Sequence, residues 1–265
     1  MKNYQVQIEE QNRIDLKKAE KVFMNYISSY DMKNPKIHLK VCHTKRVEQA
    51  AINVAKSLNL SEEQIKLAAL IGLLHDIGRF EQVKKYNTFN DSISVDHADF
   101  GIKVLFEDNL IRNFIKETTY DEIIRKAIHN HNKHQIEDGL SEQELLYAKI
   151  IRDADKIDIL YTIKIEPFTT LYGKEDISDE ILTDKVYNSI MNGELPYYKD
   201  KKTDVDDWVN KAGYIFDLYF PYSLQTIRSD LFTCLYRVNY QDEQTKERIA
   251  NIEKMLIDYF EKNAK

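Results

Sequence analysis

Apolar residues recur three and four positions apart along most of the chain, and stretches that alternate apolar and polar residues are hard to find. This spacing predicts helices with one apolar face, whereas alternation would predict strands. Only seven glycines and four prolines interrupt the 265 residues, which also favours helices. The pattern therefore predicts an all-α protein, with helices at residues 13–29, 44–58, 62–77, 94–107, 121–134, 142–163, 180–191, 205–219, 222–238 and 242–262.

One predicted helix is apolar on every side over Leu67–Leu74, and it leads directly into His75 and Asp76. A helix without a polar face is buried. Gly78 follows Asp76 by two residues, which fits the usual glycine just past a helix end. The sequence therefore predicts an imidazole and a carboxylate at the end of a core helix. Burying such groups is costly unless they are paired, hydrogen-bonded or bound to a metal.

Two other histidines lie on apolar helix stripes. The stripe that begins at His43 continues through Val47, Ala50, Val54 and Leu58. His97 stands four residues before Gly101 and seven before Val104. Each of these two imidazoles is expected to point inward. Taken alone, such a histidine is either a hydrogen-bonded core residue or a ligand, and helical spacing does not choose between the two.

The pair His129 and His131 is separated by helix geometry. Two residues turn a helix by about 200°, so the two imidazoles cannot easily bind one metal. His131 shares a face with Ile124 and Ile128, whereas His129 falls with the charged residues. The spacing therefore favours His131 as a ligand, and His129 as a solvated or substrate-side residue.

Charge and composition narrow the function classes. The chain is 31% charged with a net charge of −6, which argues against binding to duplex nucleic acid. Its two cysteines are too few for a disulfide framework. A polar N-terminus and the lack of an 18-residue apolar run predict a cytoplasmic protein without a membrane contact.

The seven histidines all lie between His38 and His134, in the order His43, His75-Asp76, His97, His131, with Asp155 after them. This order resembles the HD superfamily of metal-dependent phosphohydrolases. The resemblance covers about residues 38–165 and rests on the strings His43-Thr-Lys-Arg-Val, Leu74-His-Asp-Ile-Gly-Arg79, Asp96-His-Ala-Asp-Phe-Gly101, Ala127-Ile-His-Asn-His131 and Ile151-Arg-Asp-Ala-Asp-Lys156.

The resemblance implies a ligand set of His43, His75, Asp76, His97, His131 and Asp155. Helical periodicity does not decide between Asp153 and Asp155, and the family's Ala-Asp-Lys string selects Asp155. Four of these side chains would hold one divalent ion, and all six would hold two ions bridged by Asp76. Imidazole and carboxylate ligands suit Mn, Fe, Co, Ni and Zn, and Mg remains open.

A phosphate ester also needs cationic side chains. Arg79 follows Asp76 by three residues and is expected just beyond the helix end, as the first candidate for phosphate contact and for a catalytic role beside Asp76. Arg46 lies one turn after His43, and Lys156 adjoins Asp155. Guanidinium groups match phosphate bidentately, so the two arginines rank before the lysine. Residues 79–91 are expected to form a lid or substrate loop.

Departures from family branches narrow the substrate. Arg79 and Phe80 stand where the alarmone hydrolases carry a Glu-Asp pair, and His131 is not followed by the Gly-Tyr-Pro string of the cyclic dinucleotide phosphodiesterases. The remaining prediction is hydrolysis of a nucleotide or another small phosphate ester by a metal-activated water. An HD-type di-iron oxygenase and a non-catalytic nucleotide-binding regulator remain as alternatives.

The predicted organisation has three parts: an N-terminal helix over 1–37, a metal-binding core over 38–165, and a helical extension over 166–265, all in one compact domain. The extension is rich in Tyr and Phe, as in Tyr214–Phe220. Aromatic residues at helical spacing predict core packing, and a homodimer face is the alternative.

Overall fold

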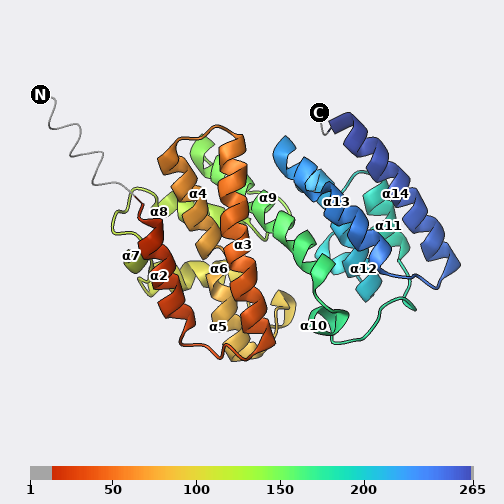
Figure 1. Cartoon of the computed structure of the whole chain (residues 1–265), viewed down its shortest axis with the longest axis horizontal. Helices are drawn as coiled ribbons and strands as arrows, with labels where there is room; N and C mark the ends of the chain where they lie inside the picture. Colours follow the sequence, from red (N-terminus) through yellow and green to blue (C-terminus); the bar gives the residue numbers. More distant parts are fainter. Residues whose placement is uncertain (1–13, 264–265) are drawn as a thin grey trace, which may run out of the picture. The chain divides into compact units, whose positions relative to one another are not determined.

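The computed structural model describes residues 14–263, and within this range the secondary structure is entirely helical (Figure 1). The predicted all-α class is confirmed. The chain divides into two compact units, residues 1–155 and 156–265, and the boundary falls inside helix α9. The boundary predicted between the core over 38–165 and the extension over 166–265 lies at the end of that helix.

The first unit contains α2 (Leu16–Ile27), α3 (Pro35–Ser57), α4 (Glu62–Leu74), α5 (Ile77–Tyr86), α6 (His97–Ile102), α7 (Ile111–Phe114), α8 (Asp121–Asn130) and the first part of α9 (Glu142–Ile165). A short 3₁₀ turn, η1 (Asp91–Ile93), precedes α6, and a π-helical turn, η2 (Lys103–Glu107), follows it.

Helix α4 forms the centre of the first unit. Ser61 and Gln64 form a capping box that fixes its start. Every residue from Leu67 to Leu74 is buried, as the all-round apolar pattern predicts. The helix packs against α2, α3 and α8, so the residues that follow Leu74 emerge in the interior of the unit.

Gly78 does not end a helix, contrary to the expectation. Helix α4 ends at Leu74, and Gly78 lies in the first turn of a new helix, α5. A Cβ atom at Gly78 would overlap the backbone of His97 and Gly101. This glycine therefore permits a close approach of α5 and α6 rather than a left-handed turn.

Other boundaries differ for local reasons. The expected loop 79–91 is helical as far as Tyr86, and it becomes irregular only after Asn87, which has a positive φ of 50°. Helix α3 starts at Pro35, capped by the Asn34 side chain. The helix predicted for 94–107 is α6 followed by the π-helical turn η2.

The second unit contains the rest of α9, α10 (Phe168–Tyr172), α11 (Asp184–Met191), α12 (Asp204–Val209), α13 (Pro221–Arg237) and α14 (Glu243–Asn263), with 3₁₀ turns η3 (Tyr198–Asp200) and η4 (Asn210–Asp217). Its core is apolar. Trp208 is 2% exposed and donates its indole N–H to the carbonyl of Cys234 at 3.0 Å. Helix α14 buries the stripe Ile249, Ile252, Leu256 and Phe260.

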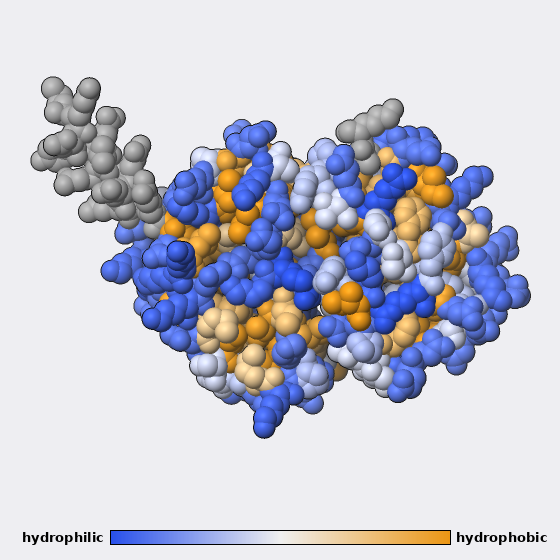
Figure 2. Space-filling model, viewed as in Figure 1, coloured by the Kyte–Doolittle hydropathy of each residue, from blue (hydrophilic) through white to orange (hydrophobic). Residues whose placement is uncertain are grey.

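The viewed face of the protein is mainly hydrophilic, with apolar patches among the charged side chains (Figure 2). None of the helices in residues 14–263 combines the length and the hydropathy that crossing a membrane requires.

Candidate metal centre

His75 and Asp76 occupy the junction between two helices. His75 is the C-cap residue of α4, and Asp76 is the N-cap residue of α5. Their exposed fractions are 0% and 2%. The apolar run of α4 thus carries two polar side chains into the interior, where they need partners. The structure supplies these partners from four further segments.

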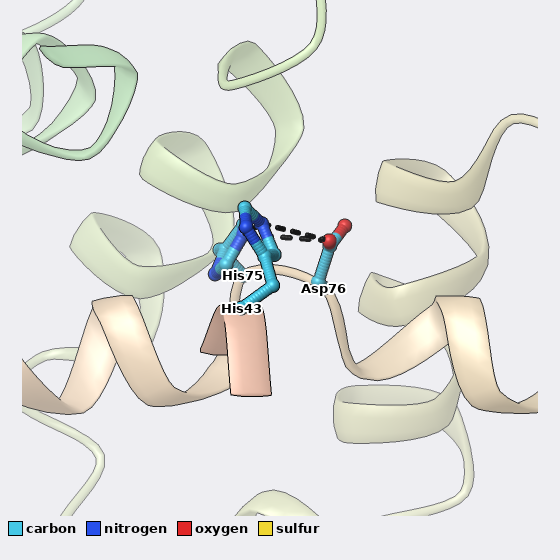
Figure 3. Close-up of side chains that lie close together, drawn as sticks. All are labelled: His43, His75 and Asp76. Carbon is cyan, nitrogen blue, oxygen red and sulfur yellow. Dashed lines mark hydrogen bonds and ion pairs between the residues drawn. The ribbon is translucent and has the colours of Figure 1, made fainter. Parts of the chain in front are cut away.

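The first group consists of His43, His75 and Asp76 (Figure 3). His43 comes from α3, which packs along α4. The Nε2 atoms of the two imidazoles lie 3.3 Å apart, and they lie 3.4 Å and 3.5 Å from Oδ2 of Asp76. Asp155 joins them from α9, with its Oδ1 atom 3.1 Å from Nε2 of His43 and 3.7 Å from Nε2 of His75.

The second group consists of Asp76, His97 and His131. His97 is the first residue of α6, and His131 is the C-cap residue of α8. Their Nε2 atoms lie 3.0 Å apart, and 3.4 Å and 3.7 Å from Oδ1 of Asp76. The two oxygens of Asp76 therefore face different histidine pairs.

Three imidazoles are held by their Nδ1 atoms. Nδ1 of His75 lies 2.7 Å from the carbonyl of Gly72, and Nδ1 of His131 lies 2.6 Å from the carbonyl of Ile128. Nδ1 of His97 lies 2.5 Å from a carboxylate oxygen of Asp91. Because these partners only accept, each Nδ1 carries the proton. Each Nε2 atom then presents a lone pair toward Asp76.

This donor set fits divalent ions. Lone pairs of neighbouring Nε2 atoms repel each other unless a cation lies between them. Two nitrogens bound to one ion at about 2.1 Å stand roughly 3.0 to 3.4 Å apart for bond angles between 90° and 109°. The observed separations of 3.3 Å and 3.0 Å fall in this range. The residues present are thus able to hold two ions with Asp76 between them.

The protonation states agree with this arrangement. Burial lowers the pKa of His75, and burial together with the charge of Arg79 lowers the pKa of His97 to about 4. Burial opposes ionisation of Asp76, but the charge of Lys40 holds the pKa of its carboxyl group well below the usual value. At neutral pH the imidazoles of His75 and His97 are therefore neutral, and the Asp76 carboxylate is ionised.

Lys40 is a member of this cluster that the sequence reasoning missed. Its Nζ atom lies 2.6 Å from Oδ2 of Asp76. A usable signal was present, since Lys40 stands three residues before His43, and residues three apart share a helix face.

Asp91 was also missed as a partner of His97. It lies in the short turn η1, after the irregular segment that follows α5. Its Oδ1 atom accepts hydrogen bonds from Arg79 at 2.7 Å and from Gln82 at 2.8 Å, while Oδ2 faces His97. No helical spacing relates Asp91 to the ligands, so periodicity could not have found it.

Arg152 holds the chain after α8. It is 1% exposed and donates to the carbonyls of Asn130 at 2.7 Å, Lys133 at 2.5 Å and His134 at 3.2 Å. These hydrogen bonds satisfy carbonyls at the last residue of α8 and just beyond it, and they fix the segment that contains His131.

Arg79 lies beside the centre, inside α5 rather than beyond a helix end. Its Nη1 atom donates to Gln82, to the carbonyl of Phe89 and to Asp91, each at 2.7 Å. Its Nε atom is 3.6 Å from Oδ1 of Asp76. These contacts tie the 87–91 segment to α5. Phosphate contact and a catalytic role for Arg79 stay predictions.

The other predicted substrate-side residues occupy separate positions. His129 points its Nδ1 atom at Asp99, 2.6 Å away. Arg46 is half-buried on α3. Lys156 is 6% exposed, in the second unit, where its Nζ atom lies 2.7 Å from Asp217 and 5.7 Å from the ring centroid of Tyr214. Substrate binding by these three residues stays a prediction.

Residues 41–160 match the family model described as HD domain. The matched range includes all six predicted ligands. None of the curated proteins or solved structures compared with the chain matches it.

Proposed function

This chain belongs to the HD superfamily through its HD domain at residues 41–160, and from this premise we propose that it is a metal-dependent phosphohydrolase. The proposed substrate is a nucleotide or another small phosphate ester. The observation that carries the proposal is the orientation of Asp76, whose two oxygens face separate pairs of Nε2 atoms.

In this proposal, His43, His75 and Asp155 would hold one ion, His97 and His131 would hold a second, and Asp76 would offer one carboxylate oxygen to each group. Divalent ions at such a centre polarise a phosphoryl oxygen and lower the pKa of water toward neutrality. The hydrogen bonds at Nδ1 of His75, His97 and His131 keep their Nε2 atoms aimed at Asp76.

The cations near the centre support an anionic substrate. Lys40 and Arg79 both lie against Asp76, and both also approach the ring of Phe89. Their positive charge would attract a phosphate group toward the carboxylate and imidazole cluster.

The testing experiment measures product release from nucleoside mono-, di- and triphosphates, cyclic nucleotides and sugar phosphates in the presence of Mn, Co, Mg or Fe. Asp76→Ala serves as the control. We expect selective, metal-dependent release of phosphate or pyrophosphate that is lost in the variant. Equal release by Asp76→Ala would contradict the proposal. Metal-dependent oxygen consumption without phosphate release would favour an oxygenase instead.

A further inference from the structure

We propose that Lys40 is the substrate-anion-binding residue of this centre, and that it holds the Asp76 carboxylate until a metal ion takes over that oxygen. The assignment rests on the proposed metal-dependent function and adds a residue that the six-ligand pattern does not contain. It predicts opposite effects of Lys40 on the binding of metal and on the binding of phosphate.

The first argument is the position of Lys40 beside Asp76. Its Nζ atom lies 2.6 Å from Oδ2 of Asp76, which is the oxygen that faces His43 and His75. The Lys40 side chain is 17% exposed, whereas that of Asp76 is 3% exposed. Lys40 therefore stands between the buried carboxylate and solvent, where an arriving anion meets it before the ligands.

The second argument is that Lys40 and the first ligand group share one oxygen, Oδ2 of Asp76. An ion bound by His43 and His75 draws on the same Oδ2 atom and repels the ammonium group of Lys40. Metal binding therefore weakens the Lys40–Asp76 pair. Lysine is a compact charge on a flexible stem, so its ammonium can move to a new anionic partner without a change in the helix.

Phe89 supplies a surface for this movement. The Lys40 ammonium lies 5.4 Å from the centroid of the Phe89 ring, and the guanidinium of Arg79 lies 5.6 Å from the same centroid. A cation within about 6 Å of an aromatic face is attracted to it. The ring thus keeps Lys40 near the centre when Asp76 is engaged elsewhere.

Arg79 is less available for the same task. Its Nη1 atom already donates to three acceptors, which belong to Gln82, Phe89 and Asp91. Turning Nη1 toward a substrate would break the contact with Asp91, the residue that faces His97, and the Nε atom is directed at Oδ1 of Asp76, 3.6 Å away. Lys40 is held by one carboxylate oxygen that a metal ion would also use, whereas Nη1 of Arg79 is held by three acceptors that are not ligands, so the geometry favours Lys40 as the anion-binding cation.

The test uses the full chain, stripped of metal with a chelator, in four forms: wild type, Lys40→Met, Lys40→Arg and Lys56→Met. Methionine keeps an unbranched stem without the charge, and arginine keeps the charge. Lys56 is an exposed residue near the other end of α3, so its variant makes the same change of charge away from the centre. Calorimetry measures the Kd for Mn²⁺ and then the Kd of the Mn²⁺-loaded protein for inorganic phosphate.

We expect Lys40→Met to bind Mn²⁺ about tenfold more tightly, because a competing cation is gone, and to bind phosphate about tenfold more weakly, because a charged donor is lost. Lys40→Arg and Lys56→Met should stay near the wild type in both measurements. Unchanged or weaker Mn²⁺ binding by Lys40→Met overturns the proposal. Unchanged phosphate binding does so too, as does a Lys40→Arg variant that behaves like Lys40→Met.

This test and the test of hydrolysis fail separately. If Lys40→Met shows both expected changes in Kd but the wild type releases no product from any phosphate ester, the proposed hydrolase activity is contradicted and the assignment of Lys40 stands. A protein that hydrolyses an ester while Lys40→Met binds metal and phosphate like the wild type would do the reverse.

Discussion

The two units of this protein use their interiors differently. The first unit buries four histidines and Asp76 close together among its helices. The second packs apolar side chains around Trp208 and pairs buried charges with each other, as in Lys156 with Asp217. Burial of apolar surface stabilises a fold directly. Burial of imidazoles and carboxylates costs free energy that partners or ions must offset. The buried site therefore lowers the stability of the first unit. We expect substitutions in the site to affect mainly metal binding, and substitutions in the apolar core of the second unit to affect mainly the free energy of unfolding.

The largest effect is expected for Asp76→Asn. The amide keeps the shape of the side chain but supplies a nitrogen in place of one ligating oxygen. We expect Mn²⁺ binding to be lost and turnover to fall by at least about a thousandfold, since metal assistance is worth several kcal/mol. Helix content, measured by circular dichroism, should stay unchanged. If Asp76→Asn retains metal binding and turnover, the buried cluster of the first unit is not the functional site, and the contrast between the two interiors fails.

A second change tests the apolar interior. Ile252 is 0% exposed on α14, within the second core. Truncation to alanine should lower the free energy of unfolding by about 2–5 kcal/mol, through lost burial and the cavity that remains. Chemical denaturation measures this loss. The Kd for Mn²⁺ should stay within about twofold of the wild type, and a larger change would show that the units are not separable in this sense.

Asp91→Asn tests the positioning of one imidazole. The carboxylate of Asp91 accepts from Nδ1 of His97, and loss of such a partner typically weakens metal affinity by about 10- to 100-fold. Calorimetry with Mn²⁺ measures the change. Asp99→Asn is the matched control, because Asp99 faces His129 instead. An equal loss in both variants would point to a general effect of charge.

The stability of the metal-free protein should depend on pH. The pKa of His97 is lowered to about 4 by burial, against about 6.5 in an unfolded chain. The unfolded state therefore binds more protons between these values, so stability is complete above about pH 6.5 and falls toward pH 4. His97 alone contributes a loss of about 2 kcal/mol at pH 5. Denaturation in the presence of a chelator checks this, and a flat profile would contradict it.

The smallest expected effect is a local one. Mn²⁺ should slow amide exchange around His75 and Asp76, because an ion that binds only the folded state stabilises the unit that holds it. Exchange in α13 and α14 should change little. Equal protection throughout the chain would mean that the units respond to the ion as one.

Much of this architecture followed from periodicity. The all-round apolar pattern located α4, and the stripe at His43 located the inner face of α3. Helical rotation separated His131, which faces Asp76, from His129, which faces Asp99. These inferences held because each depended on spacing within one helix.

The features that were missed depend on contacts between segments. Gly78 looked like a helix end because its close approach to Gly101 is invisible in a single stretch of sequence. Asp91 was missed because it reaches His97 from an irregular segment. The contacts of Arg79 with Phe89 and Asp91 likewise depend on how the chain returns after α5. A one-dimensional pattern does not contain such pairings.

Helix α9 places two ligands at once. It carries Asp155 directly. Its Arg152 side chain also donates to the carbonyls of Asn130 and Lys133, on either side of His131, and so fixes the position of that residue. Arg152 and Asp155 are three residues apart on one rigid rod. A slip of α9 along its own axis by a single residue would rotate both side chains by about 100° around the helix axis and shift them by about 1.5 Å along it. A shift of α9 would therefore move Asp155 and the segment that contains His131 together. A substitution that changes the position of this helix is expected to alter both ligand groups at once.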